Sequence, residues 1–559
     1  MKKILLFACG LLMSFSAQAQ DFETAKEAVK NMGVGWNLGN TLDAHDASKS
    51  WTTTAQHETC WGQPVTKPEL LKMMKEAGFG AIRVPITWFQ EMDKDGKVND
   101  AWMNRVKEVV DYVIDNGMYC IINVHHDTGE DKNGNTTWLK ASTKSYTANK
   151  AKYEGLWRQI ANKFKDYDQH LIFEAYNEML DEKNKWNEPT DATDGYKAIN
   201  SYAKSFVTTV RSTGGNNKNR NLVVNTYSAS SMATAMKNLD LPEETGHIIF
   251  QLHSYPNWKS ESNAKTEIDN LISNIKTNLL KRAPVIIGEY ATFCEWPSKI
   301  DYYDTDSKVA LYAMDYLIKQ TKTAGIGTFY WMGLSDGDYR NLPIFHQPDL
   351  AQTLVKAYYG STDGYKYPSQ DDFETVYTVK YTSQWAELFL YGGWGNSTSF
   401  KLSDYKGLRI ELDDDYSSKL QIKVYGDIIG KNSDGSDKHN EQYIPLTAGS
   451  TTSTLDFDAS ILGSSVYRIT LQALEGTSLT AKVKNYKIIK NDGTEVYGSV
   501  SVGWGCTFTS ETTPKTSGIR NVQLNKREAS DAIYNLQGQR ISKPRKGLYI
   551  QNGKKLIAQ

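Results

Sequence analysis

Residues 103–124 read MNRVKEVVDYVIDNGMYCIINV, and this stretch contains the pattern that decides the fold. Its first part, Met103–Asn116, has the apolar spacing of an amphipathic helix and ends before Gly117. Its second part, Tyr119–Val124, is an apolar run with the length of a buried strand. A helix followed at once by a buried strand is typical of the repeating unit of a parallel sheet.

The same alternation extends in both directions, from Asn31 to Tyr359. Amphipathic stretches such as Lys67–Ala77, with Pro68 in its first turn, separate further short apolar runs. The eight predicted strands are Gly33–Leu38, Ala81–Ile86, Tyr119–Val124, Leu171–Tyr176, Asn221–Thr226, Ile248–Leu252, Val285–Gly288 and Ile326–Trp331. Eight β-then-α units predict a (β/α)8 barrel of the α/β class, and a doubly wound sheet is the alternative.

The composition limits the classes of function. The 559 residues suffice for two to four domains, and 40% apolar with 23% charged residues is typical of globular domains. Because 64 basic residues nearly balance 65 acidic ones, we expect neither a nucleic acid nor an anionic membrane as partner. The 14 Trp and 33 Tyr supply ring faces on which sugars could stack.

The ends of the chain and its second half predict further units. Lys2 and Lys3 precede an apolar run that ends before Ala17-Gln-Ala19, so residues 1–19 are expected to be a signal peptide of a secreted or cell-surface protein. No later segment is apolar for long enough to span a membrane. We expect a barrel domain at 20–362, a β-sandwich at 371–509, a linker at 510–518 and a short β tail at 519–559.

The β-sandwich and the tail each leave alternatives open. Trp385, Tyr391, Trp394 and Trp504 suggest a carbohydrate-binding module, whereas a structural spacer would place these rings in its core. The tail, with a hairpin turn expected at Asn552-Gly553, looks like a sorting signal for an outer-membrane secretion system. The scattered Cys60, Cys120, Cys294 and Cys506 predict no zinc site, and pairing of Cys60 with Cys294 stays open.

Chemically active side chains follow the predicted strands. Catalytic groups of a barrel lie at the carboxyl ends of its strands. The groups found there are Arg83, Asn123-Val-His-His-Asp127, Tyr176-Asn-Glu178, His253-Ser-Tyr255, Gly288-Glu-Tyr290 and Tyr330-Trp331. We therefore expect an active site at one mouth of the barrel.

Two of these groups, Glu178 and Glu289, form a carboxylate pair suited to cleaving a glycosidic bond. A separation of about 5–5.5 Å predicts retention of configuration, with Glu178 as acid/base and Glu289 as nucleophile. We expect ionised Glu289 to raise the proton affinity of Glu178, and Arg83 to keep Glu289 ionised. Tyr255 could donate to Glu289, and Asn177 could hold the sugar 2-hydroxyl. Glu174 is interpreted as a barrel-interior hydrogen-bonding group.

These motifs carry a resemblance to glycoside hydrolase family 5, most of all to its endo-β-1,4-glucanase and xyloglucanase branch. The matching segments are Gly35–Asp43, Ile82–Pro85, Val124–His126, Tyr176–Glu178, His253 with Tyr255, Ile287–Glu289 and Trp331. The resemblance implies a retaining (β/α)8 barrel without a cofactor, in which Glu178 is the acid/base and Glu289 the nucleophile. It implies a supporting shell of Arg83, His125, Asn177, His253, Tyr255 and Trp331.

Substrate contacts and alternative functions complete the expectations. We expect Asn37, His126, Trp61, Trp88, Trp138, Trp258 and Trp296 to bind substrate. A metal at His125-His126-Asp127 is disfavoured, because adjacent strand residues point to opposite faces.

The leading hypothesis is a secreted endo-β-1,4-glucanase acting on cellulose-like glucans. The alternatives are the same mechanism on xyloglucan, mannan or mixed-linkage glucan, or a non-catalytic polysaccharide-binding protein.

Overall fold

The computed structural model describes residues 22–130, 137–255, 258, 260–291, 307–396, 399–476, 478–498 and 500–515, and four short strands between 533 and 558. The predicted leader at 1–19 lies outside these residues, as do Cys294 and Trp296. Among the helices described, none combines the length and the apolar character that crossing a membrane requires.

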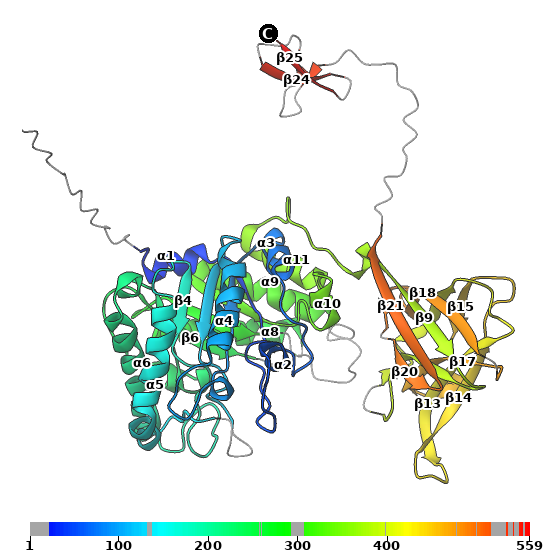
Figure 1. Cartoon of the computed structure of the whole chain (residues 1–559), viewed down its shortest axis with the longest axis horizontal. Coiled ribbons are helices and arrows are strands. Elements are labelled where there is room, and N and C mark those ends of the chain that lie inside the picture. Colours follow the sequence, from blue (N-terminus) through cyan, green and yellow to red (C-terminus); the bar gives the residue numbers. More distant parts are fainter. Residues whose placement is uncertain are drawn as a thin grey trace, which may run out of the picture.

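Eight parallel strands close into a barrel, which confirms the predicted (β/α)8 fold (Figure 1). Each strand pairs with the next along the chain, and the last pairs with the first. The observed strands agree with the predicted runs to within a few residues. They are β1 (Val34–Asn37), β2 (Phe79–Val84), β3 (Tyr119–Asn123), β4 (Leu171–Glu174), β5 (Leu222–Asn225), β6 (Ile248–Ser254), β7 (Val285–Tyr290) and β8 (Ile326–Trp331).

Helices surround the barrel, and their ends have ordinary sequence causes. In α4 (Asp100–Ile114), the side chain of Asn99 accepts a hydrogen bond from the Ala101 amide, and Gly117 supplies the positive φ of 64° that follows the helix. The other barrel helices are α1 (Ala25–Asn31), α2 (Thr54–Glu58), α3 (Pro68–Glu76), α5 (Thr143–Lys163), α6 (Ala192–Ser212), α7 (Ala233–Lys237), α8 (Glu261–Asn278), α9 (Ser307–Ala324), α10 (Asp338–Asn341) and α11 (Pro348–Tyr359).

The interior of the barrel is apolar at one end and polar at the other. Helix α1 packs Ala25, Ala28 and Val29 against inward-facing strand residues such as Ile172 and Phe329, and together they form one buried cluster. Further along the strands the inward positions become polar: Asn37, Arg83, Asn123, Glu174, Asn225 and Gln251 are all 0% exposed. The strands therefore present their chemically active groups only towards their carboxyl ends.

The second region is a β-sandwich of two main antiparallel sheets. One has the order β14-β13-β17-β10-β20 and the other β15-β12-β18-β9-β21, with β19 beside β18. The first sheet contains β10 (Glu387–Tyr391), β13 (Leu420–Lys431), β14 (Asp437–Pro445), β17 (Arg468–Ala473) and β20 (Ser501–Trp504). The second contains β9 (Phe373–Tyr381), β12 (Tyr405–Leu412), β15 (Thr452–Asp456), β18 (Leu479–Lys490), β19 (Glu495–Tyr497) and β21 (Cys506–Pro514).

One expectation for the sandwich was wrong. The predicted linker begins too early, because Ser510–Pro514 continue β21 and pair with β9 as far as Phe373. Serine and threonine indicated a linker, but alternating residues of this kind also suit an edge strand. Of the four rings for which two roles were left open, Tyr391 lies in the core, as the spacer alternative expects: it is 6% exposed and its ring lies 5.2 Å from that of Phe400.

The tail contains a small antiparallel sheet in the order β23-β22-β24-β25. In the pair β24 (Gly547–Gln551) and β25 (Lys554–Ala558), Gln551 lies opposite Lys554. The turn predicted at Asn552-Gly553 lies outside the described residues. The remaining strands are β22 (Ile533–Tyr534) and β23 (Arg540–Ile541).

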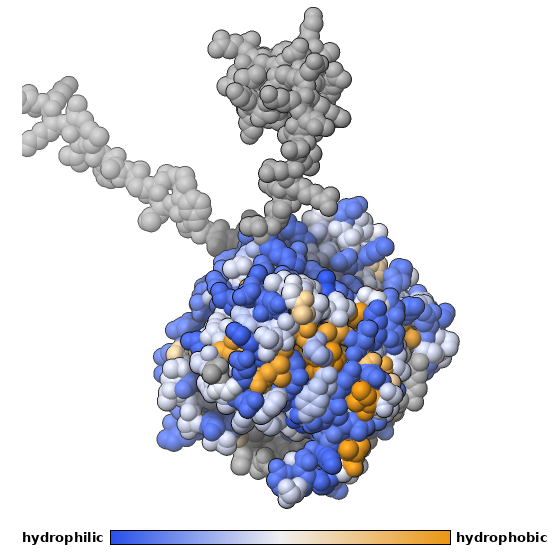
Figure 2. Space-filling model, turned by 90° about the vertical axis from the view of Figure 1, so that its right-hand side faces the viewer, coloured by the Kyte–Doolittle hydropathy of each residue, from blue (hydrophilic) through white to orange (hydrophobic). Residues whose placement is uncertain are grey.

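The surface in Figure 2 is largely hydrophilic, and its hydrophobic residues form a few small, separate groups. In the described residues, exposed aromatic side chains include Trp61 and Trp186 in the barrel domain, and Trp385, Trp394 and Trp504 in the sandwich. Large contiguous apolar patches are typical of protein docking surfaces. The exposed rings here are isolated, so they are available to ligands other than proteins.

Candidate active site

Glu178 and Glu289 come together at the carboxyl mouth of the barrel. Glu178 follows the end of β4, and Glu289 lies within β7. The pairing of β7 shifts register next to Glu289 on both sides, towards β6 and towards β8. Such irregularities re-aim side chains at barrel rims. As a result, ligand atoms of Glu178, His253 and Glu289 lie within 4.8 Å of one another.

Arg83 connects the buried carboxylates. Its Nη1 donates to Glu289 Oε1 at 2.7 Å, while its Nε and Nη2 donate to both oxygens of Glu174 at 2.6 and 2.8 Å. The same guanidinium donates to the side-chain oxygens of Asn37 and Asn177. Because Glu174 balances most of the charge of Arg83, Glu289 gains orientation from this contact and less net electrostatic stabilisation than an unpaired arginine would give.

The catalytic candidates have different hydrogen-bond partners. The Tyr255 hydroxyl donates to Glu289 Oε2 at 2.6 Å. His253 Nδ1 lies 2.8 Å from Glu178 Oε1 and 3.5 Å from Glu289 Oε2. Burial lowers the pKa of His253 to about 4, so the imidazole is neutral near pH 7. A neutral ring with its proton on Nδ1 donates to Glu178 and leaves the other carboxyl oxygen of Glu178 available for substrate.

The two carboxyl groups also differ in proton affinity. Burial raises the pKa of Glu178 to about 7, Arg83 opposes this rise, and the charge of Glu174 adds to it. Ionised Glu289 was expected to raise the proton affinity of Glu178, and burial is instead the first cause. Burial also raises the pKa of Glu289, but His253, Arg83 and the Tyr255 hydroxyl all lower it.

His125 lies beside this pair and is held by Asn123. The Asn123 side-chain oxygen accepts from the Ile86 amide, so its NH2 group donates to His125 Nδ1 at 3.0 Å. We assign the ring proton to Nε2, which lies 4.0 Å from Glu289 Oε1. This tautomer points a donor into the space between the carboxylates.

A row of rings extends outward from the carboxylates. The rings of Trp331 and His125 are nearly parallel, with centroids 5.9 Å apart, and His126 follows at 4.5 Å from His125. Trp61 continues the row at 5.2 Å from His126 and is 38% exposed. Gly39 is needed here, because a Cβ at this position would lie 2.8 Å from the Trp331 indole. His125 itself is only 2% exposed, so the ring surfaces that remain for a chain of sugars are those of Trp331, His126 and Trp61.

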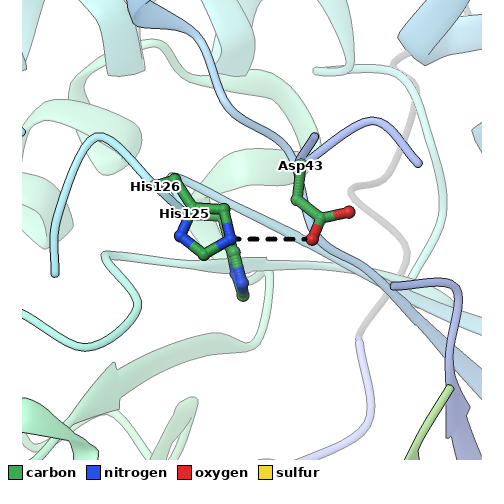
Figure 3. Close-up of side chains that lie close together, drawn as sticks. All are labelled: Asp43, His125 and His126. Atoms are coloured by element: carbon green, nitrogen blue, oxygen red, sulfur yellow. Dashed lines mark ion pairs between the residues drawn. The ribbon is translucent and has the colours of Figure 1, made fainter. Parts of the chain in front are cut away.

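His126 and His125 lie close together, contrary to the expectation that they point to opposite faces. Strand β3 ends at Asn123, so the alternation of a strand no longer holds at these residues. Figure 3 shows His126 directed at Asp43, and His126 Nε2 lies 3.8 Å from Asp43 Oδ2. Burial raises the pKa of Asp43 to about 6 and lowers that of His126 to about 3.

Two clusters have donor atoms close enough for a metal ion: Asp43 with His125 and His126, and Glu178 with His253 and Glu289. In the first, His125 Nδ1 is already bound by Asn123. In the second, both oxygens of Glu289 accept hydrogen bonds from Arg83 and Tyr255. A cation at either place would have to displace these partners, so the contacts fit an organic substrate better than a metal.

Several predicted substrate-binding residues have other roles. Trp88 is 0% exposed and its Nε1 donates to the Asn123 carbonyl, and Trp258 is 2% exposed in the core, so neither offers a ring face to a ligand. Asn37 is also buried, and it donates to the Gly288 carbonyl and accepts from Arg83. Trp138 is half-buried, with its Nε1 donating to Asp127. Trp296 lies outside the described residues.

The sequence interpretation missed two contributors to the site and one exposed ring in a neighbouring loop. Asn123 orients His125, and Asp43 faces His126. The available signal was that Asn123 belongs to the motif that contains the two histidines, and that Asp43 ends the motif Gly35–Asp43. Trp186, 46% exposed, lies in the loop between β4 and α6. That loop leaves from the carboxyl end of β4, the end from which Glu178 also comes, which would have indicated it.

A family model, related proteins and solved structures all match the barrel part of this chain. The family model described as Cellulase (glycosyl hydrolase family 5) matches residues 45–336. Endoglucanase A of Clostridium longisporum is 33% identical over 363 residues, which cover 59% of this chain. The chain spans 66% of the length of that relative, slightly less than two thirds.

Solved structures match the same part of the chain. A GH5-4 broad specificity endoglucanase from an uncultured bacterium is 55% identical, with a TM-score of 0.59, and the match covers 61% of this chain and 97% of that one. A glycoside hydrolase family 5 enzyme from Prevotella bryantii B14, solved as a mutant with a xyloglucan tetradecasaccharide, is 41% identical. Its TM-score is 0.57, and the match covers 60% of this chain and 99% of that one.

Proposed function

Since the chain belongs to glycosyl hydrolase family 5, we propose that it is a retaining endo-β-1,4-glucanase with Glu178 as acid/base and Glu289 as nucleophile. One observation carries the proposal: the two carboxyl groups lie within 4.8 Å of each other in unlike surroundings. This separation suits direct attack by a carboxylate and leaves too little room for an intervening water.

In the first step, a carboxylate oxygen of Glu289 attacks the anomeric carbon. The bond to the leaving sugar oxygen breaks, and Glu178 transfers its proton to that oxygen. A pKa of about 7 keeps Glu178 largely protonated in mildly acidic solution, as a general acid requires. Arg83 and Tyr255 hold Glu289 in place and favour its ionised form.

In the second step, water attacks the anomeric carbon of the glycosyl ester, and Glu178 accepts the proton of that water. Formation of the ester removes the charge of Glu289, and because the repulsion between the two carboxyl groups is mutual, this loss lowers the pKa of Glu178. Breaking of the ester bond then returns Glu289 as a carboxylate, with retained configuration at the sugar.

The row of rings supports attack within a glucan chain. Trp331, His126 and Trp61 provide partly exposed ring surfaces on one side of the carboxylates, and Trp186 stands exposed in the loop after β4. A relative described as a broad specificity endoglucanase and another solved with a xyloglucan oligosaccharide support a glucan substrate, with xyloglucan as the second candidate.

The proposal is tested by reducing-sugar release from soluble cellulose, xyloglucan, mannan and mixed-linkage glucan, assayed side by side. We expect release from the glucans and a fall in viscosity that precedes most of the sugar release, as internal cleavage produces. Glu289→Ala should abolish both signals. Undiminished activity of Glu289→Ala would exclude the proposed nucleophile, and inactivity of the unmodified protein on every polysaccharide would favour a binding protein.

We also propose that the protein is secreted or displayed at the cell surface. The apolar run before Ala17-Gln-Ala19 supports removal of residues 1–19, and the tail at 519–559 supports handling by an outer-membrane secretion apparatus. The test is the N-terminal sequence of the protein recovered from outside the producing cells, which should begin at Gln20.

A further inference from the structure

The sandwich has an outer sheet face with aromatic and polar side chains. Along β10, β13 and β17 the side chains alternate between its two faces. Leu388, Ile422 and Leu471 belong to the sandwich core. Phe389, Lys423 and the other intervening residues are not members of that core, so they face away from it.

The strand register arranges this outer face in rows that cross the sheet. One row joins Trp504, Glu387, Gln472 and Gln421, each opposite the next on neighbouring strands. The adjacent row joins Phe389, Thr470, Lys423 and Tyr443. At about 4.8 Å between strands, the distance across the sheet from edge strand β20 to edge strand β14 is about 19 Å.

Exposed rings lie at the ends of these rows and beside Phe389. Trp394 is 66% exposed, and its ring lies 5.3 Å from that of Phe389, edge to face. Trp504 is 49% exposed on β20, and Tyr443 is 50% exposed on β14. Trp504 and Tyr443 lie on opposite edge strands and Trp394 lies in the loop after β10. With polar groups between them, these rings do not form the continuous apolar patch that a protein partner would bury.

Between the rings lies a floor of fixed hydrogen-bonding groups. The Tyr425 hydroxyl donates to both oxygens of Glu387, and Gln472 donates to Glu387 Oε1 at 2.8 Å. Gln421 in turn donates to Gln472. The Arg468 guanidinium lies 4.7 Å from the Tyr425 ring centroid, and its buried Nε has no hydrogen-bond partner within the described residues. Such a donor points to a ligand with hydroxyl or other acceptor oxygens.

The charges of this face cancel. Lys423 lies 3.0 Å from Glu441 and 3.8 Å from Glu387, so one cation stands between two carboxylates, and Arg468 supplies the second positive charge. A balanced face gives no long-range attraction for a nucleic acid or another strongly charged polymer. Aromatic rings with intervening amide, carboxylate and guanidinium groups instead suit a neutral polymer rich in hydroxyls.

We propose that this outer face, defined by Trp394, Trp504, Tyr443 and the intervening Tyr425–Glu387–Gln472 network, is a second polysaccharide-binding site that holds an extended neutral glucan. The choice of glucan rests on the function proposed for the barrel, because a site on the same chain as the active centre would retain the polymer that this centre cleaves. Binding here would raise the local concentration of substrate without taking part in hydrolysis.

The test compares the double variant Trp394→Ala/Trp504→Ala with Ile461→Ala in the full-length protein. Ile461 is the matched control, because it is 44% exposed and lies on α12 (Ala459–Leu462) of the same sandwich, outside the two rows. The double variant, the Ile461→Ala control and their otherwise unmodified parent all carry Glu289→Gln, so that the polymer stays intact. The assay is retardation in native gels that contain hydroxyethyl cellulose or xyloglucan, with near-UV circular dichroism to verify the fold.

We expect the double variant to bind at least about tenfold more weakly than its parent, since two stacking surfaces are lost, and Ile461→Ala to bind like the parent. Equal retardation of the double variant and its parent, or no retardation of the parent by either polymer, overturns the proposal. The proposed hydrolysis is scored separately, as sugar release from soluble cellulose at a saturating concentration. There Trp394→Ala/Trp504→Ala with intact Glu289 should match the unmodified protein, because a higher local substrate concentration no longer matters once the active site is full. Failure of hydrolysis in both proteins, together with intact gel retardation, would refute the function of the barrel and leave the second site standing.

Discussion

The hydroxyl of Tyr255 gives the sharpest test of how the nucleophile is kept ionised. It donates to Glu289 Oε2 at 2.6 Å, in a region where Glu289 is almost fully buried. Tyr255→Phe removes this donor and preserves the ring. A hydrogen bond to a charged group contributes about 1.5–3 kcal/mol, and 1.36 kcal/mol corresponds to one pKa unit, so the pKa of Glu289 should rise by about 1 to 2 units.

The assay is the pH dependence of kcat/KM on a soluble glucan. Because Glu289 must be ionised to attack, loss of the hydrogen bond should move the acid limb of the profile to higher pH by the same amount. The alkaline limb, which reports deprotonation of Glu178, should stay in place and serves as an internal control.

A matched variant excludes a general effect of losing a buried hydroxyl. Tyr290→Phe removes a hydroxyl one residue after the nucleophile, and this hydroxyl is not among the donors to Glu289 in the described part of the chain. It should leave both limbs unchanged. The reasoning is refuted if the acid limb of Tyr255→Phe does not move, or if Tyr290→Phe moves it equally.

Four further outcomes follow from the same geometry. In the unmodified protein, kcat/KM should fall as pH rises through about 7, because Glu178 then loses the proton that it donates. Glu178→Gln should lower turnover of polymers by about 10²- to 10⁴-fold and affect an aryl glycoside with a good leaving group far less, which steady-state kinetics on both substrates would reveal. Glu174→Gln should shift the alkaline limb to lower pH, since a charge that raises the pKa of Glu178 is lost, and should lower the melting temperature because Arg83 loses its buried partner. Overnight treatment with EDTA should leave activity unchanged, whereas an EDTA-sensitive activity restored by a divalent cation would contradict the interpretation of Asp43 and His126 as metal-free.

The barrel could be predicted closely because each strand is a short apolar run followed by a helix. The eight runs place the polar side chains at one mouth whatever the details of packing, so Glu178, Glu289 and Arg83 were expected near one another. The structure brings them together, and their catalytic roles stay predictions that the kinetic variants test.

The remaining errors have physical causes that a single sequence does not reveal. Trp88 and Trp61 both follow barrel strands, but only packing decides that the first is buried against β3 while the second stays at the surface. The position of His125 beside His126 depends on where β3 ends, which the apolar pattern fixes only to within a residue or two. In the sandwich, Thr512 and Thr513 indicated a linker until strand pairing with β9 was known.

The saturation of the Arg83 guanidinium has a practical consequence. Every nitrogen of this side chain is already bound to Glu174, Glu289, Asn37 or Asn177 before any sugar arrives. The ordering of Glu289, the proposed nucleophile, is therefore completed when the chain folds, and little substrate affinity has to be spent on assembling it. Engineering of the cleft for other glycans can accordingly proceed from the outer rings, while lysine at position 83, which lacks the planar fork, would dismantle the arrangement even though it keeps the charge.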